Sequence, residues 1–171
     1  PVRMESQIVR DSVLHLAGVL DAKMGGPTEN PNAAAGRRRS MYFTQSRDAR
    51  NAFVAMFDDA DIQRCYRRTA SIVPQQALAM ANSRLTLEMS RLLSERIVEQ
   101  PPAASNDQAA FVRNSFELLL ARQPTETELA ECQATLKLLA VALKDKSDAG
   151  VRGRAALVHA LLNHNDFVTI R

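Results

Sequence analysis

Tryptophan is absent from this chain of 171 residues, and aromatic residues make up only 5% of it. Aliphatic side chains and the six methionines must therefore supply most of a buried core. Apolar residues reach 46% and charged residues 24%, the balance of an ordinary globular domain. No apolar run approaches the roughly 18 residues that a membrane-spanning helix needs. The composition thus predicts a folded domain without a membrane span.

Cysteine is also scarce, with only Cys65 and Cys132, which lie far apart. The sequence has no Cys-x-x-Cys-His motif, so it cannot itself attach a c-type haem, and we predict no cofactor. Two separate buried thiols are the simpler interpretation. A single disulfide that ties the central loop to a late helix is the alternative.

Patterns that would indicate catalysis or metal binding are missing as well. No Gly-x-Ser-x-Gly segment and no evident base occur. His159 and His164 are five residues apart, whereas two ligands on one helical face need a spacing of four. The cluster Asp58, Asp59 and Asp61 lacks the glycine turn and distal glutamate of a calcium loop. The sequence therefore predicts no metal site and leaves open whether the protein is an enzyme.

Charge of either sign is not concentrated, because 22 basic and 19 acidic residues give a net charge of only +3. The arginines are scattered over several loops, so nucleic-acid binding is the least favoured function and we predict no nucleic-acid partner. Such binding would require an affinity that falls steeply with salt.

Helical spacing of apolar residues recurs in six segments. They cover residues 4–20, 46–57, 74–99, 105–121, 125–143 and 149–162. No strand has a partner to pair with, so we predict an all-α fold, an irregular bundle of about six helices with two long ordered loops. A weak break at residues 101–105 does not leave two convincing cores, so residues 1–171 are predicted to form a single helical domain.

The first and third of these segments carry specific expectations. The first should bury Val9 and Val13 and turn Arg10 and Asp11 to the opposite side. The third, which begins at Pro74, is the longest predicted helix, and Leu78 starts its buried stripe.

The ends of the helices are predicted from capping residues. Ser46 can cap the second helix. Capping boxes are predicted where Ser105 precedes the fourth helix and where Thr125 precedes the fifth. After the last helix, Phe167 and Ile170 should fold back onto the core.

Four arginines lie in the two loops that flank the second helix: Arg38, Arg39, Arg67 and Arg68. Because guanidinium binds two oxygens at once, the leading hypothesis is structural, with Arg39 or Arg68 bridging to Asp58 or Asp61. The alternative is an anion or partner site, to which Tyr42, Gln75 and the positive end of the third helix would contribute.

Several short blocks occur in an order that resembles a bacterial domain of unknown function. They are Arg10-Asp11, Gly25-Gly26-Pro27, Arg38-Arg39-Ser40-Met41-Tyr42, Phe57-Asp58 with Asp61, Arg67-Arg68-Thr69, Pro74-Gln75-Gln76-Ala77-Leu78 with Asn82, Arg122-Gln123-Pro124-Thr125 with Glu128, and Leu162-Asn163 with Asp166-Phe167. The family is abundant in planctomycetes and is typically the C-terminal domain of large proteins that often also carry a cytochrome-c-like domain.

The resemblance implies a fragment that lacks the N-terminal part of the family domain and belongs to an extracytoplasmic multidomain protein at the periplasm or cell surface. It implies no established activity and no catalytic residues. The favoured function is an interaction or scaffold domain that docks onto other domains of its parent, including a cytochrome-c-like domain, through the Arg-rich loop face. The alternative is a helical subdomain that contributes to a carbohydrate- or anion-binding site, or to an enzymatic one, shared with the missing part.

Overall fold

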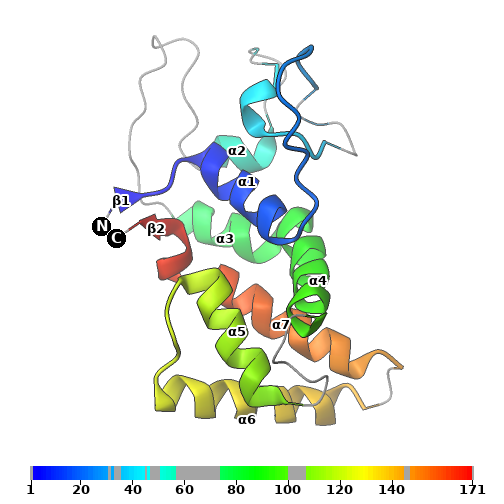
Figure 1. The fold of residues 1–171 in the computed structure, drawn as a ribbon, viewed down its shortest axis with the longest axis vertical. Helices are drawn as coiled ribbons and strands as arrows, with labels where there is room; N and C mark the ends of the chain where they lie inside the picture. Colours follow the sequence, from blue (N-terminus) through cyan, green and yellow to red (C-terminus); the bar gives the residue numbers. More distant parts are fainter. Residues whose placement is uncertain are drawn as a thin grey trace. The chain divides into compact units, whose positions relative to one another are not determined.

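The computed structural model describes residues 2–30, 32, 36–44, 46, 51–56, 74–99, 107–144 and 147–170, apart from the side chains at 56, 74 and 75 (Figure 1). These residues contain seven α-helices, and their only paired strands are two residues long. The prediction of an all-α bundle is thereby confirmed. The central acidic and Arg-rich loop, with Asp58, Asp61, Cys65, Arg67 and Arg68, lies outside the described residues.

The chain divides into two compact units. One comprises residues 1–83 and 168–171, and the other comprises residues 84–167. The boundary thus falls between the helices α3 (Pro74–Asn82) and α4 (Arg84–Glu99), rather than at the weak break at residues 101–105. The single-domain expectation stays a prediction.

The first unit contains α1 (Ser6–Leu16), the 3₁₀ turn η1 (Ser40–Tyr42), α2 (Ala52–Met56) and α3. Helix α1 packs against both η1 and α2, and α2 packs against α3. Apolar side chains from these elements form its core, among them Val9, Val13, Leu14, Phe43, Phe53, Val54 and Met80.

Helix α1 ends four residues earlier than its apolar pattern predicts, because Gly18 adopts a left-handed conformation with φ of 74°. The N–H of Gly18 donates to the carbonyl of His15, and the N–H of Val19 donates to that of Leu14. This pair of bonds is a Schellman motif, in which glycine satisfies the last carbonyls at no steric cost.

The two ends of the described chain pair with each other in a minimal sheet (Figure 1). Strand β1 (Val2–Arg3) runs antiparallel to β2 (Thr169–Ile170), with Val2 opposite Ile170. Ile170 is 53% exposed, so the expectation that it folds onto the core is wrong. Phe167 is 4% exposed, so the same expectation for Phe167 is confirmed. Paired residues of a two-stranded ladder lie on the same face, and Val2, the partner of Ile170, is also exposed, at 72%.

The predicted third helix is two helices rather than one. It breaks at Ser83, and the side chain of Asn82 donates to the carbonyl of Leu78, one turn earlier. Side-chain amides that bond locally to the backbone compete with helix continuation. Leu78 is 58% exposed, so its predicted burial is wrong, and the buried face of α3 is formed instead by Gln76, Ala79 and Met80.

The second unit contains α4, α5 (Gln108–Leu120), α6 (Glu126–Ala142) and α7 (Ala149–Leu162), followed by all but the last residue of the 3₁₀ turn η3 (Asn165–Val168). Helix α4 packs most extensively on α7, and α5 contacts the other three helices. Its core is aliphatic and phenylalanine-rich, with Met89, Leu93, Ile97, Phe111, Val112, Phe116, Leu136, Val158, Leu162 and Phe167 buried.

Small hydroxyl side chains are buried within this unit as well. Ser90 and Ser94 lie on α4, and Ser115 lies on α5. Ser90 donates to the carbonyl of Thr86 at 2.5 Å, and Ser115 donates to that of Phe111 at 2.7 Å. Their hydrogen bonds stay within their own helix, so these residues allow close packing without leaving a buried donor unpaired.

Helix starts follow the capping prediction in one case of three. The Thr125 box is confirmed, because Thr125 Oγ1 accepts from the N–H of Glu128 and Glu128 accepts from that of Thr125. Helix α5 instead starts after Asp107, whose carboxylate accepts from the N–H of two following residues. Helix α2 starts after Asn51, whose amide oxygen accepts from the N–H of Val54, so Ser46 is not its cap.

Candidate interaction surface

The loop between α1 and α2 is organised by a buried arginine, Arg10. This side chain is only 3% exposed, so the expectation that it lies on the outer side of α1 is wrong. Its guanidinium donates to the carbonyls of Gly36 and Arg38 and to Ser40 Oγ, and lies 4.5 Å from the ring centroid of Phe43. Burial lowers the pKa of Arg10, and the neighbouring carboxylate of Asp11 opposes that shift.

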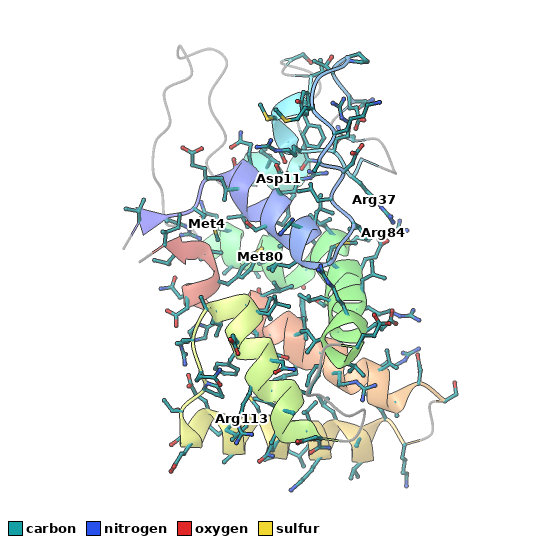
Figure 2. The ribbon with its side chains drawn as sticks, in the orientation of Figure 1. Met4, Asp11, Arg37, Met80, Arg84 and Arg113 are labelled. Carbon is teal, nitrogen blue, oxygen red and sulfur yellow. The ribbon has the colours of Figure 1, made fainter. Side chains whose placement is uncertain are left out.

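Asp11 adds a second anchor for the same loop and lies on α1 beside the segment that carries Arg37 (Figure 2). Both of its carboxylate oxygens accept from the backbone N–H of Ser40 at 3.0 Å. The hydroxyl of Ser40 donates to the same carboxylate at 2.6 Å, and Arg10 lies 3.1 Å from it. Ser40 is thus held through both its backbone and its side chain, which fixes the turn η1 on α1.

Arg38 organises the outer part of the loop and is 8% exposed. It donates to the carbonyls of Pro27 at 2.9 Å and Gly25 at 2.6 Å, and its guanidinium stacks 4.0 Å from the ring centroid of Tyr42. The carboxylate of Glu29 lies 3.8 Å from Arg38 Nε. The charge is therefore used to order irregular backbone, and a ligand would have to displace these acceptors to reach it.

Two glycines let the backbone approach this guanidinium. Gly25 and Gly26 have φ of 75° and 94°, values that side chains with a Cβ rarely adopt. The N–H of Gly25 donates to the hydroxyl of Tyr42 at 2.8 Å. Backbone hydrogen bonds also hold the loop. The N–H of Asp21 donates to the carbonyl of Arg37, and Glu29 and Phe43 form an isolated parallel β-bridge.

The exposed side chains in the described part of this loop include methionines and arginines beside other polar groups. Met24 is 72% exposed and Met41 63% exposed, while Arg37 is exposed and Arg39 is half-buried. Arg39 Nη1 lies 3.7 Å from the sulfur of Met24, a weak acceptor. We call Met24, Arg37, Arg39 and Met41 the loop face.

The structure brings three predicted site residues together, Arg38, Arg39 and Tyr42, and all belong to this loop. Arg67 and Arg68 lie outside the described residues, as does the side chain of Gln75. The sequence interpretation missed the roles of Arg10 and Asp11. The signal for Arg10 was present, because it lies on the face of α1 that also carries Ser6, Val13 and Ala17 at helical spacing.

A second charged cluster lies in the other unit, around Arg122. Its guanidinium binds both carboxylate oxygens of Glu128 at 2.7 and 2.9 Å and contacts Asp166 at 3.1 Å. It also lies 5.2 Å from the ring centroid of Phe116. The hydrogen bond from Arg122 lowers the pKa of Glu128 to about 2, helped by the N–H of Thr125. These groups satisfy one another, so the cluster joins α5, α6 and η3 structurally.

Within the described part of the chain, no group of three or more histidine, cysteine or acidic residues is placed to hold a metal ion. No helix there is long and apolar enough to cross a membrane. Cys132 has a free thiol whose pKa is raised by burial and by Glu128 and Glu131, which disfavours the reactive thiolate.

Comparison with known proteins assigns a family. No curated protein and no solved structure was found to match this chain. A model of the PSD1 family, described as a protein of unknown function (DUF1553), matches residues 1–136. That range includes α1, the loop face and the Thr125 capping box, whereas the block from Leu162 to Phe167 lies beyond it. The chain therefore belongs to the PSD1 (DUF1553) family of proteins of unknown function.

Proposed function

We propose that this chain is an interaction domain that docks onto another domain of its parent protein through the loop face. The observation that supports this is the way the loop is built. Arg10, Asp11 and Arg38 hold its backbone from inside, and its outer surface presents two exposed methionines and two arginines.

A loop fixed before binding loses little conformational entropy when a partner arrives. Methionine and arginine suit such a contact, because both are enriched at interfaces and methionine adapts to irregular apolar surfaces. Arg37 and Arg39 favour a partner surface that carries carboxylates. The chemistry of the loop face thus favours an acidic patch with apolar side chains in it.

The parent protein is proposed on the family resemblance alone. We infer a bacterial extracytoplasmic protein of several domains, of planctomycete type, in which a cytochrome-c-like domain is the candidate partner. This chain would provide the docking surface and no catalytic group.

The test is direct binding between this chain and the rest of the parent polypeptide, purified separately and measured by isothermal titration calorimetry. Arg39→Glu and Met41→Asp should each weaken binding about tenfold or more, because each alters a side chain at the proposed contact. The matched control is Arg113→Glu, the same charge reversal at an exposed position of α5 (Figure 2). Equal loss in all three variants, or in none, would exclude the loop face as the contact.

A second function, an anion- or carbohydrate-binding surface, is favoured by the state of Arg39. Its guanidinium contacts only a thioether among the interactions described for it, so it could bind a stronger acceptor without breaking a salt bridge. Titration with sulfate and with glucuronate, followed by the NMR shifts of the backbone N–H groups of Met41 and Tyr42, tests this. Arg39→Gln should abolish those shifts, and their persistence would place any anion elsewhere.

A further inference from the structure

Met24 has surroundings that differ from those of the other exposed methionine in the loop. Its sulfur has two donors directed at it, Arg39 Nη1 at 3.7 Å and the hydroxyl of Tyr42 at 4.0 Å. No donor to Met41, which is similarly exposed at 63%, is among the hydrogen bonds described. Two donors around one thioether are unusual, because sulfur accepts hydrogen bonds only weakly.

These distances leave room for an additional atom on the sulfur. An oxygen bonded to sulfur and directed between the two donors would lie closer to each of them than the sulfur does, though by less than the full S–O bond length. It would then lie within reach of ordinary hydrogen bonds, about 2.7–3.2 Å for N–H and O–H donors. A sulfoxide oxygen is a strong acceptor, so the same donors would bind it far better than they bind the thioether.

We propose that Met24 is a site of oxidation, and that Arg39 and Tyr42 form a cradle that stabilises its sulfoxide. The oxidant is hydrogen peroxide. The sulfur lone pair attacks one peroxide oxygen, the S–O bond forms and the O–O bond breaks. Sulfur loses two electrons, and the proton of the attacked oxygen passes to the other oxygen, which leaves as water. The proposal does not depend on the docking function.

Neighbouring groups hold the cradle in place before any oxidation. The ring of Tyr42 is fixed under the guanidinium of Arg38, and its oxygen also accepts from the N–H of Gly25. That oxygen can accept one hydrogen bond and donate another, so it can bind Gly25 and a sulfoxide together. Met24 is 72% exposed, so a small peroxide can reach the sulfur.

Oxidation normally harms a protein by making an apolar side chain polar. At Met24 we expect oxidation to stabilise the protein instead. The singly oxidised species at Met24, produced with dilute hydrogen peroxide, separated by chromatography and assigned by peptide mapping, should melt about 2 °C higher than the reduced protein. The species oxidised at Met41 should show no rise, which makes it the matched control.

The variants Tyr42→Phe and Arg39→Gln test the cause. Tyr42→Phe keeps the ring under Arg38 and removes only the hydroxyl. The quantity compared is the difference in melting temperature between the oxidised and reduced forms of the same variant. A general loss of stability lowers both forms equally and cancels. Each variant should reduce the rise at Met24 by half or more. A melting temperature that is unchanged or lowered by oxidation at Met24, or a rise that persists in both variants, would overturn the proposal.

Discussion

At the scale of single residues, Arg10 shows how a charged side chain can belong to a core. Its position on α1 is on the buried stripe, and its charge alone argues for exposure. The charge is tolerated because carbonyls of Gly36 and Arg38, the hydroxyl of Ser40 and the carboxylate of Asp11 surround it. A buried charge with such partners is stable, and one without them is not.

Replacement of Arg10 by methionine should therefore lower the free energy of unfolding by about 3 kcal/mol, because three acceptors and one carboxylate lose their donor. Arg10→Lys should recover only part of this loss, since a lysine cannot donate in several directions from one planar group. Urea denaturation monitored by circular dichroism measures both. Arg113→Met, at an exposed position, is the control and should change stability by less than about 0.5 kcal/mol. A small effect of Arg10→Met would mean that the loop is held by other contacts.

Glu128 allows a prediction of pH dependence at the same scale. Its folded pKa of about 2 lies below the ordinary value of 4.5, so folding favours its charged form. The resulting stability is fully present above about pH 5 and is lost as the pH falls toward 2. Glu128→Gln should cost about 1 kcal/mol at pH 7, because the pair is partly exposed. The difference between the variant and the natural protein should shrink steadily between pH 5 and pH 2.5 in urea titrations. A difference that stays constant over this range would rule out the ion pair as its source.

At the scale of elements, local chemistry predicted some helix ends and not others. The box of Thr125 and Glu128 was readable because both partners lie within four residues. The break at Ser83 was not, since the apolar pattern on either side of it continues with little change of phase. Helix α4 packs on α7 and α5, whereas α3 packs on α2, and such distant partners leave no mark in a local pattern.

The end of α1 provides a test of an element boundary. Gly18 has φ of 74°, so Gly18→Ala should destabilise the protein by about 1 kcal/mol through strain in the left-handed region. Gly150, in the first turn of α7, is the matched control, because an added Cβ would meet only Arg154 Nη1 at 3.9 Å. Gly150→Ala should be neutral or stabilising by a few tenths of a kcal/mol, since it reduces the freedom of the unfolded chain. Thermal melts of both variants measure whether each substitution lowers or raises stability. Equal effects would contradict the Schellman assignment.

At the scale of the whole molecule, the sequence predicted the fold class and the presence of a core. Helical periodicity is a local property, and six of its segments were sufficient to indicate an all-α protein. Long ordered loops were predicted, but the sequence did not show what orders them. In the described residues 21–30 and 36–44 it is Arg10 and Arg38, whose acceptors are backbone carbonyls up to 28 residues away. Every residue carries a backbone carbonyl whatever its type, so such contacts could not be predicted from residue types.

The division into two units bears on how the whole chain unfolds. Leu93 is fully buried in the second unit, where α4 packs on α7, and Leu93→Ala should cost about 3 kcal/mol there. The first unit has its own core around Val9 and Val13, so hydrogen exchange should accelerate in residues 84–167 and change less in α1. Hydrogen exchange with mass spectrometry separates the two regions. The reciprocal substitution, Val13→Ala, should accelerate exchange mainly in α1. If instead each substitution accelerates exchange equally throughout, the two units open together, and residues 1–171 behave as the single cooperative domain that the sequence predicts.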